Sequence, residues 1–285
     1  MSFAICSLSV VPVRSQSNPQ SELLSQLLFG ELVEIMDKKG RQWYKVRGFA
    51  DNHFGWVQTN HLQEITKEEA EKVEENFAFA LDTAQSVRGN NNHFIVPIGA
   101  RLPLFDGLRF SFFNKSFEYS GQAVSPEELQ RNTIELLPKL ARKFLNIPEM
   151  KGGKTPFGMD SSAFIQQVFA FIGVQLPRTA DLQIDLGNTV DFAAQANEGD
   201  LAFFENKKGR ITHVGLILAG DTIIHAHGNI RIDKIDHFGI FDEDTKKYSH
   251  KLRLIKRHLE ASQEKSTVEI EIKEGMDLTE QKILF

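Results

Sequence analysis

The sequence predicts an α+β fold, in which one or two small all-β barrels precede a domain that has its helices first and its strands afterwards. Two observations support this prediction. The first 64 residues contain short apolar segments separated regularly by turn residues, which is typical of a small barrel. Beyond residue 124, two amphipathic helical stretches come before a run of alternating segments. The 285 residues are enough for roughly two domains.

The N-terminal barrel is expected to span residues 1–64. Its strands are expected at Ala4–Arg14, Leu27–Asp37, Gln42–Arg47 and Gly55–Gln58. Pairs of residues that favour turns lie between or beside these segments, namely Asn18-Pro19, Lys39-Gly40 and Asp51-Asn52. Regular spacing of this kind suggests a small all-β barrel.

A charged linker and a second group of strands are expected next. Residues 65–79 are rich in Glu and Lys and have helical spacing, so we expect a helix with a solvated face that joins two domains. Residues 80–123 contain strand-like segments at Asn92–Ile98, Arg101–Phe105, Leu108–Phe113 and Ser116–Tyr119. These segments suggest a second small barrel.

Residues 124–260 are expected to form the α+β domain. Ser125 begins a Ser-Pro-Glu-Glu run, which has the order of an N-cap, a first-turn proline and early acids, and the helix should end before Pro148. An antiparallel meander is expected at Asp200–Phe204, Ile211–Leu218, Thr222–Ala226 and Ile230–Asp233. Lys251–Lys256 can add a strand, and residues 261–285 are a charged C-terminal tail.

The second helix of this domain is expected to begin at a serine. Apolar residues recur with the spacing of one helix face at Phe164, Ile165, Val168, Phe169 and Ile172. Asp160 is a preferred cap residue, and Gly173 is a natural stop. Ser161 should therefore lie at the N-terminus of a buried helix, where free N–H groups and the helix dipole favour negative charge. Nucleophiles are often placed at such a position.

Three histidines are expected on one face of the meander. A turn at Ala219–Asp221 places His213, His225 and His227 on the same side, because side chains alternate along a strand. Gly215 would face His225 and leave room beside it. Register alone leaves open whether His225 or His227 is the partner of His213.

Such a cluster supports two functional hypotheses, beside the simpler one that these histidines have no role. Three His ligands and a water form a known catalytic zinc set, but the motif holds no further acidic ligand, so no metal is expected. Alternatively, one His accepts the proton of a nucleophile while a second His holds its tautomer. The helix-capped position of Ser161 favours this second hypothesis.

Four segments together resemble the NlpC/p60 family of cell-wall cysteine peptidases: GGKTPFGMDSSAF, GDLAFF, ITHVGLIL and IIHAHGNIRID. This resemblance covers roughly residues 125–258 and implies a papain-like domain. The segments VPVRS, LLFGELVEIMD, WYKVR and GWV resemble a bacterial SH3-like domain. Family members with such domains cut between γ-D-Glu and the diamino acid of peptidoglycan stem peptides. The resemblance therefore implies a murein-derived L-Ala-γ-D-Glu-diamino acid peptide as the ligand.

The resemblance also implies roles for individual residues. It places the nucleophile position at Ser161, the base at His213 and the residue that orients the base at His225. Asp160 and Ser162 flank the nucleophile position and are expected to line the substrate side, where the Asp helps to hold the free amine of an N-terminal L-Ala. No cofactor is implied.

Several positions depart from the family pattern. Ser161 stands where the family has its nucleophilic Cys, Ala163 replaces a Gly, and Glu149 replaces an active-site Tyr. His53 stands where a substrate-facing Tyr is common, and residues 179–183 depart from the pattern that Leu176-Pro177-Arg178 keeps.

A serine hydroxyl cannot be ionised as a helix-capped thiol can, so it needs its base and an oxyanion hole in the transition state. We therefore expect weak or no hydrolysis. The alternatives are an engineered or natural Ser variant of a working endopeptidase, and a non-catalytic peptide-binding or interaction module.

Composition excludes some other functions. A net charge of -5 without a basic block disfavours nucleic acid as a partner. Cys6 is the single cysteine, so neither a disulfide framework nor a Cys-based metal site is expected. The N-terminus lacks the basic and apolar regions of a signal peptide, and no segment is expected to span a membrane. A cytoplasmic location is the resulting expectation.

Overall fold

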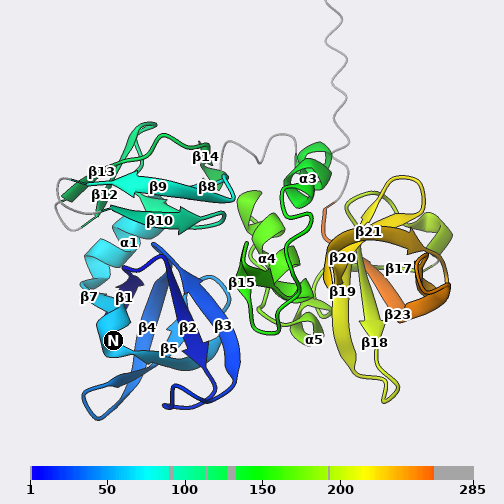
Figure 1. Ribbon diagram of the computed structural model, residues 1–285, viewed down its shortest axis with the longest axis horizontal. Helices are drawn as coiled ribbons and strands as arrows, with labels where there is room; N and C mark the ends of the chain where they lie inside the picture. The colour runs from blue at the N-terminus through cyan, green and yellow to red at the C-terminus, as the bar shows by residue number, and fades with distance from the viewer. Residues whose placement is uncertain (1, 90–92, 113–114, 127–132, 192, 260–285) are drawn as a thin grey trace, which may run out of the picture.

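The computed structural model of the chain describes residues 2–89, 93–112, 115–126, 133–191 and 193–259. Figure 1 shows the helix α4 (Ser161–Phe171) in the middle of the molecule. The N-terminal strands and a second group of small sheets lie on one side of it, and a strongly curved sheet lies on the other. Helix and strand are mixed in the way that the α+β prediction requires, and this prediction is confirmed.

Residues 2–65 form one seven-stranded antiparallel sheet with the order β3-β2-β6-β5-β4-β1-β7. A short 3-10 helix, η1 (Thr59–His61), precedes its last strand. The strands are β1 (Ser2–Cys6), β2 (Val10–Arg14), β3 (Leu23–Leu28), β4 (Leu32–Lys39), β5 (Trp43–Gly48), β6 (Phe54–Gln58) and β7 (Leu62–Ile65). Small and branched apolar side chains from all seven of these strands fill its core, among them Val11, Val33, Val46 and Val57.

Two expected strands are each divided by a turn. The segment Ala4–Arg14 contains β1 and β2, and Leu27–Asp37 contains the end of β3 and most of β4. Gly30, which separates β3 from β4, has φ +79°, a conformation that glycine adopts without strain. A Cβ on Gly30 would also lie 2.1 Å from the carbonyl oxygen of Arg101, so the turn allows the next group of sheets to approach.

Helix α1 (Lys67–Glu75) connects the first sheet to the next strands. Thr66 and Glu69 form a capping box at its start, which explains why the helix begins there. Helix was expected as far as residue 79, but Phe77–Ala80 form strand β8. Ala70 is buried against the first barrel, so α1 packs on that barrel as well as presenting a charged face to solvent.

The region after α1 contains a four-stranded sheet, β10-β9-β13-β12, and a three-stranded sheet, β11-β8-β14. Its strands besides β8 are β9 (Ala84–Arg88), β10 (His93–Pro97), β11 (Arg101–Pro103), β12 (Arg109–Phe112), β13 (Lys115–Glu118) and β14 (Ala123–Val124). Strands β8, β9 and β14 were not expected. Strand β11 is shorter than expected, because Leu104 turns the chain with φ +51°. Phe29, in the turn after β3, packs into the core of this region, so the two units share apolar contacts.

Among the described residues, three helices and a small hairpin open the last domain. They are α3 (Thr133–Arg142), the β15–β16 hairpin (Lys154–Thr155 and Gly158–Met159), α4 and α5 (Ala180–Gln183). The first helix was expected to begin at Ser125, but residues 127–132 lie outside the described part of the chain. Helix α4 begins at Ser161 and is followed by Gly173 at φ +79°, as the capping and stop residues predicted.

The last sheet has the order β17-β23-β18-β19-β20-β21-β22, and β22 also pairs with β23, so six of its strands close into a barrel. The strands are β17 (Asn188–Val190), β18 (Leu201–Glu205), β19 (Ile211–Leu218), β20 (Thr222–His227), β21 (Asn229–Ile235), β22 (Gly239–Asp242) and β23 (Lys247–Arg257); the 3-10 helix η3 (Ala193–Gln195) follows β17. The expected meander is confirmed as β18 to β21, whereas β17 and β22 were not expected.

The two faces of this barrel have different neighbours. Val214 and Leu216 of β19 belong to the large core that includes Phe164 and Val168 of α4. Ile217, whose side chain lies on the opposite face of β19, packs with Phe204 in the barrel interior. Helix α4 therefore lies against the outside of β19 and β20, and the odd-numbered side chains of these strands point to the other face.

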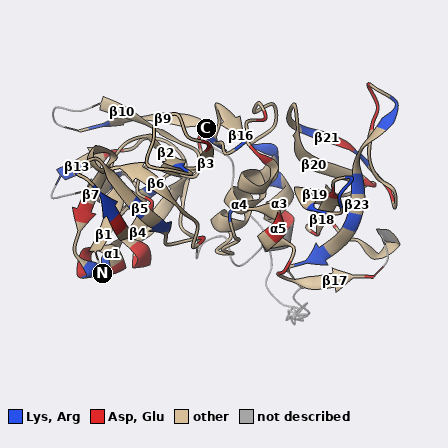
Figure 2. Cartoon of the chain, turned by 90° about the horizontal axis from the view of Figure 1, so that it is seen from below, with Lys and Arg blue, Asp and Glu red and all other residues tan. Residues whose placement is uncertain are grey.

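Charged residues are distributed over both halves of the molecule. Figure 2 shows Lys and Arg along β23 and acidic residues on α1. In the described part of the chain, no helix has both the length and the apolar content needed to cross a bilayer. The tail expected at residues 261–285 lies outside the described residues.

Candidate active site

Ser161 occupies the first turn of α4, as the sequence predicted. Asp160 is the N-cap, and its Oδ1 accepts a hydrogen bond from the backbone N–H of Ala163 at 2.8 Å. Only 6% of Ser161 is exposed. The hydroxyl therefore lies at the positive end of the helix dipole, in a site that is largely protected from water.

The Asp160 carboxylate is fully occupied by protein donors. Its Oδ2 accepts from the Gly152 backbone N–H at 2.9 Å, and Ser162 donates to its Oδ1 at 3.0 Å. Arg178 donates to both oxygens, at 2.9 Å and 2.7 Å, in a bidentate pair. A carboxylate offers about four lone-pair positions, so all of them are in use around the start of α4.

Arg178 joins this helix start to the N-terminal barrel. Its side chain is 1% exposed, and its Nε donates to the Ser25 hydroxyl on β3 at 2.8 Å. Lys154 makes two further links to the same barrel, through its backbone N–H to Gln26 Oε1 at 2.8 Å and through its ammonium to Glu31 at 2.6 Å. The barrel thus helps to fix the start of α4, although the two regions are more than 120 residues apart in sequence.

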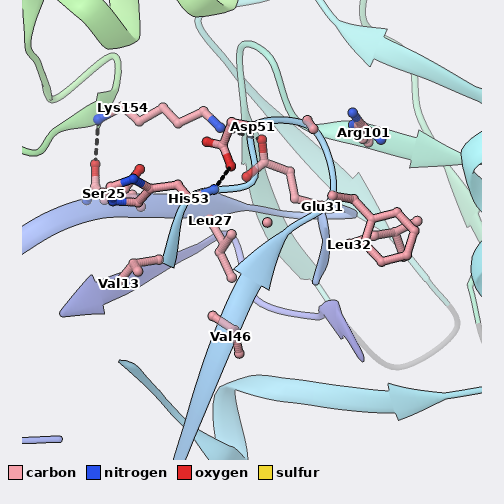
Figure 3. Close-up of a pocket in the computed structure, with 14 residues that line it drawn as sticks. Val13, Ser25, Leu27, Glu31, Leu32, Val46, Asp51, His53, Arg101 and Lys154 are labelled. Carbon is pink, nitrogen blue, oxygen red and sulfur yellow. Dashed lines mark hydrogen bonds and ion pairs between the residues drawn. The ribbon is translucent and has the colours of Figure 1, made fainter. Parts of the chain in front are cut away.

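A small pocket lies at this junction of the barrel and the last domain. Figure 3 shows Glu31, Asp51, His53 and Lys154 around it. Its volume is about 20 Å³, which is room for a single water molecule and far too little for a peptide. The buried Nε2 of His53 has no partner among the described residues, and burial lowers the pKa of this imidazole. His53 is therefore neutral near pH 7, with its polar edge at the junction.

The second part of the site is a line of hydrogen bonds that runs from β19 to β21. His213 Nε2 lies 2.9 Å from His225 Nδ1, and His225 Nε2 lies 2.9 Å from Asp233 Oδ2. An ionised carboxylate only accepts, so His225 donates from Nε2 and accepts at Nδ1. His213 must then donate from its own Nε2, which leaves its Nδ1 as a proton acceptor. This is the tautomer that a general base on β19 requires.

The environment keeps these imidazoles neutral. Burial, followed by the neighbouring imidazoles of His250, His225 and His227, lowers the pKa of His213 well below its usual value of 6.5. Burial also lowers the pKa of His225, although hydrogen bonding to Asp233 opposes this effect. A neutral base suits a hydroxyl nucleophile, because it can accept the proton only while it is uncharged.

The structure answers the question of which histidine lies next to His213. Gly215 faces His225 across β19 and β20, and a Cβ on Gly215 would lie 3.0 Å from the His225 Cβ, so the glycine leaves the expected room. His225 forms the hydrogen bond to His213, whereas the His227 ring lies parallel to that of His225 at a centroid distance of 6.1 Å.

Two further residues of this cluster were missed in the sequence. His250 on β23 stacks on His213 with ring centroids 4.0 Å apart. The predicted strand began one residue after His250, and no motif marks it. Asp233 lies on the strand that pairs with β20, where period-2 alternation from the register partner of His225, Arg231, could have placed it on the same face.

The two halves of the site pack against each other without a hydrogen bond between Ser161 and His213 in the described part of the chain. Helix α4 packs on β19, but no hydrogen bond joins the Ser161 hydroxyl to His213 or to any other residue that the structure describes. Such nucleophile–base bonds are often long before substrate binds and tighten in the substrate complex.

Comparison with known families gives two matches. Residues 150–250 match the model described as "NlpC/P60 family", and residues 13–62 match the model described as "Bacterial dipeptidyl-peptidase Sh3 domain". The first of these regions contains Asp160, Ser161, Ser162, His213 and His225.

Similar proteins and structures agree with these matches. The chain is 29% identical over 217 residues to a gamma-D-glutamyl-L-lysine dipeptidyl-peptidase of Bacillus subtilis (strain 168), which covers 71% of each chain. A protein with the same description from Bacillus cereus (strain ATCC 10987) is 25% identical over 230 residues, which covers 72% of this chain and 68% of the relative.

The crystal structure of an NlpC/P60 family protein from Bacillus cereus ATCC 10987 has the same fold. Its TM-score is 0.78 at 21% identity, and the alignment covers 90% of this chain and 100% of that one. The chain thus carries a domain of the NlpC/P60 family behind a bacterial SH3-like domain.

Proposed function

We propose that this protein binds murein-derived peptides that contain a γ-D-Glu-diamino acid bond, and that Ser161 leaves it with slow or no hydrolysis of that bond. The observation that supports this proposal most directly is the position of Ser161. A hydroxyl stands in the first turn of a buried, Asp-capped helix, at the position where the resemblance implies a nucleophilic thiol. Two relatives, of which the alignments cover 71% and 68%, are described as gamma-D-glutamyl-L-lysine dipeptidyl-peptidases, which suggests the class of peptide.

The remaining groups of the proposed site suit acyl transfer. His213 is proposed as the base and His225 as the residue that orients it, because the Asp233-His225-His213 line leaves Nδ1 of His213 free to accept a proton. Ser162 and Asp160 are proposed to lie on the substrate side. Asp160 already pairs with Arg178, so a peptide amine would meet a carboxylate whose charge is largely balanced.

The substitution of sulfur by oxygen is expected to reduce the rate strongly. A helix N-terminus lowers the pKa of a thiol and yields a reactive thiolate, whereas a hydroxyl remains protonated and depends on its base at every step. Within the described residues, the hydroxyl of Ser161 is not held by a hydrogen bond to His213. A loss of about three or more orders of magnitude relative to a working nucleophile is the expected scale.

The test is a comparison of the parent protein with Ser161→Cys on L-Ala-γ-D-Glu-L-Lys. Release of free Lys is measured at high protein concentration, and peptide binding to the parent is measured by calorimetry. We expect the parent to bind the peptide with micromolar-range affinity and to turn it over slowly or not at all. We expect Ser161→Cys to cleave it at least about 100-fold faster.

Ser162→Cys is the matched control, because it places the same thiol in the same helical turn one residue later. It should not raise the rate, and His213→Ala should abolish the gain in the Ser161→Cys background. Binding without turnover in Ser161→Cys would support a non-catalytic peptide-binding module. If neither this peptide nor its meso-diaminopimelate analogue binds to the parent, the proposal is wrong.

A further inference from the structure

The histidine cluster in the barrel contains more nitrogen ligands than a base and its orienting partner require. His213 on β19, His225 on β20 and His250 on β23 each offer one ring nitrogen, and these three nitrogens lie within 4.8 Å of one another. His213 and His225 are buried, while His250 is partly exposed and gives the cluster an edge toward solvent. Three convergent imidazoles are the ligand set of an open-site zinc centre.

The contacts around the cluster resemble the outer ligands of a metal site. Histidines that bind a metal usually donate their second ring N–H to a carboxylate or another polar group, which fixes the ring. His225 donates from Nε2 to the buried Asp233 at 2.9 Å. His250 Nδ1 lies 2.9 Å from the Ser249 hydroxyl. His225 Nδ1 faces His213, and the Nε2 atom of His250 is not engaged by Ser249.

The local charge also favours a cation. The buried Asp233 lies 2.9 Å from His225 and 2.8 Å from Arg231, so one cation already balances part of its charge. An ionised carboxylate behind a ligating imidazole stabilises positive charge on the metal, so Asp233 would support a divalent ion through His225.

We propose that His213, His225 and His250 bind one divalent transition-metal ion of the zinc class. Zinc–nitrogen bonds of about 2.0–2.1 Å at tetrahedral angles need nitrogens about 3.3 Å apart. The His213–His225 pair is at 2.9 Å and must open slightly. His250 must turn out of its 4.0 Å stack on His213 to direct its nitrogen at the ion, and its partial exposure leaves it room to do so.

Metal binding and proton acceptance are mutually exclusive at His213. A neutral His213 that binds an ion through Nε2 carries its proton on Nδ1, the atom that would otherwise act as the base. The ion would therefore hold the site in a form without a base. This consequence rests on the proposed function, whereas the metal site itself does not.

The test uses the full chain without a histidine tag, freed of metal with EDTA and then dialysed. Zn²⁺ binding is measured by calorimetry, and Co²⁺ is used as a spectroscopic probe, because tetrahedral Co²⁺ absorbs intensely in the visible range. We expect one Zn²⁺ per chain and a tetrahedral Co²⁺ spectrum. His250→Ala should weaken Zn²⁺ binding at least tenfold and abolish that spectrum. Asp233→Asn should weaken binding about tenfold through loss of the outer contact.

His227→Ala and Ser161→Ala are the controls. His227 is the neighbouring histidine outside the three-ligand set, and Ser161 belongs to the helix, so both variants should bind Zn²⁺ as the parent does. Thermal unfolding of each variant without metal checks that it is folded, and His250→Gln provides a milder change if His250→Ala is not. The proposal is overturned if the parent binds no Zn²⁺, or if folded His250 variants bind it as tightly as the parent. Unchanged peptide binding in a His250 variant would separate this outcome from a failure of the proposed function.

Discussion

The two halves of the candidate site hold their polar groups in opposite ways. At the start of α4, charges are paired: Asp160 and Arg178 form a bidentate ion pair that also reaches Ser25 in the SH3-like barrel. In the last barrel, His213 and His225 are neutral and are ordered by hydrogen bonds that end on Asp233. The first half depends on contacts between domains, and the second depends on the register of one sheet. Stability and chemistry should therefore respond differently to changes in each half.

The largest effect is expected from Arg178→Ala. It leaves the Asp160 carboxylate without its bidentate partner and removes the link to Ser25. Breaking a buried pair by removing one member costs about 3–5 kcal/mol, and the 21% exposure of Asp160 places this case near the lower limit. Urea denaturation should show a loss of about 3 kcal/mol. A loss below about 1 kcal/mol would mean that the ion pair does not hold the helix start.

Gly215→Ala tests the half of the site in the last barrel, where His213 and His225 are neutral; this is called the neutral half. A Cβ at this position would lie 2.7 Å from Ile223 Cδ1 and 3.0 Å from His225 Cβ, so His225 must move. Overpacking of this kind costs about 1–3 kcal/mol. The same denaturation series measures it, and the imidazole signals of His213 and His225 in NMR spectra should shift. Gly209→Ala is the control for lost glycine freedom, since nothing lies within 4 Å of a Cβ there, although its φ of +74° adds some strain. Unshifted imidazole signals in Gly215→Ala would contradict the packing argument.

Local sequence signals were sufficient for the helix half. The cap at Asp160, the apolar spacing of α4 and the stop at Gly173 are each local signals, because each depends on residues that are neighbours in the sequence. They could therefore be recognised without a structure. The contact between Arg178 and Ser25 could not be predicted, because Ser25 lies 153 residues away and belongs to another domain. Ordinary spacing rules carry no information about such contacts.

The barrel half was only partly predictable. Alternation placed His213 and His225 on one face, and the resemblance favoured His225 over His227 as the partner. His250 was missed because β23 joins the cluster by closing the barrel against both β18 and β22, and this closure is a property of the whole sheet. Strand β22 was missed for the same reason.

Acid should destabilise the neutral half. The pKa of His250 is lowered to about 4, mainly by burial and then by neighbouring imidazoles, and burial also lowers the pKa of His213 well below its usual value. Unfolded histidines bind protons below about pH 6.5, whereas the folded ones do not until the pH reaches their lowered pKa. The free energy of unfolding should therefore be complete above pH 6.5 and fall between pH 6.5 and 4. His250→Gln should reduce this fall by roughly 1 kcal/mol, after allowance for its partial exposure. His237→Gln is the control, and an equal slope in both variants would contradict the assignment.

The smallest effect is expected where the same two domains meet through an exposed pair. Lys151 in the last domain forms an ion pair with Glu22, which directly precedes β3, but their side chains are 86% and 52% exposed. Lys151→Ala should leave the free energy of unfolding unchanged within the precision of urea denaturation, because solvent and salt screen such pairs. It is the matched comparison for Arg178→Ala, since both residues link the same two units across the start of α4. If Lys151→Ala cost as much as Arg178→Ala, the number of links between domains, rather than their burial, would control stability. A loss in Arg178→Ala alone instead assigns the coupling to the buried guanidinium.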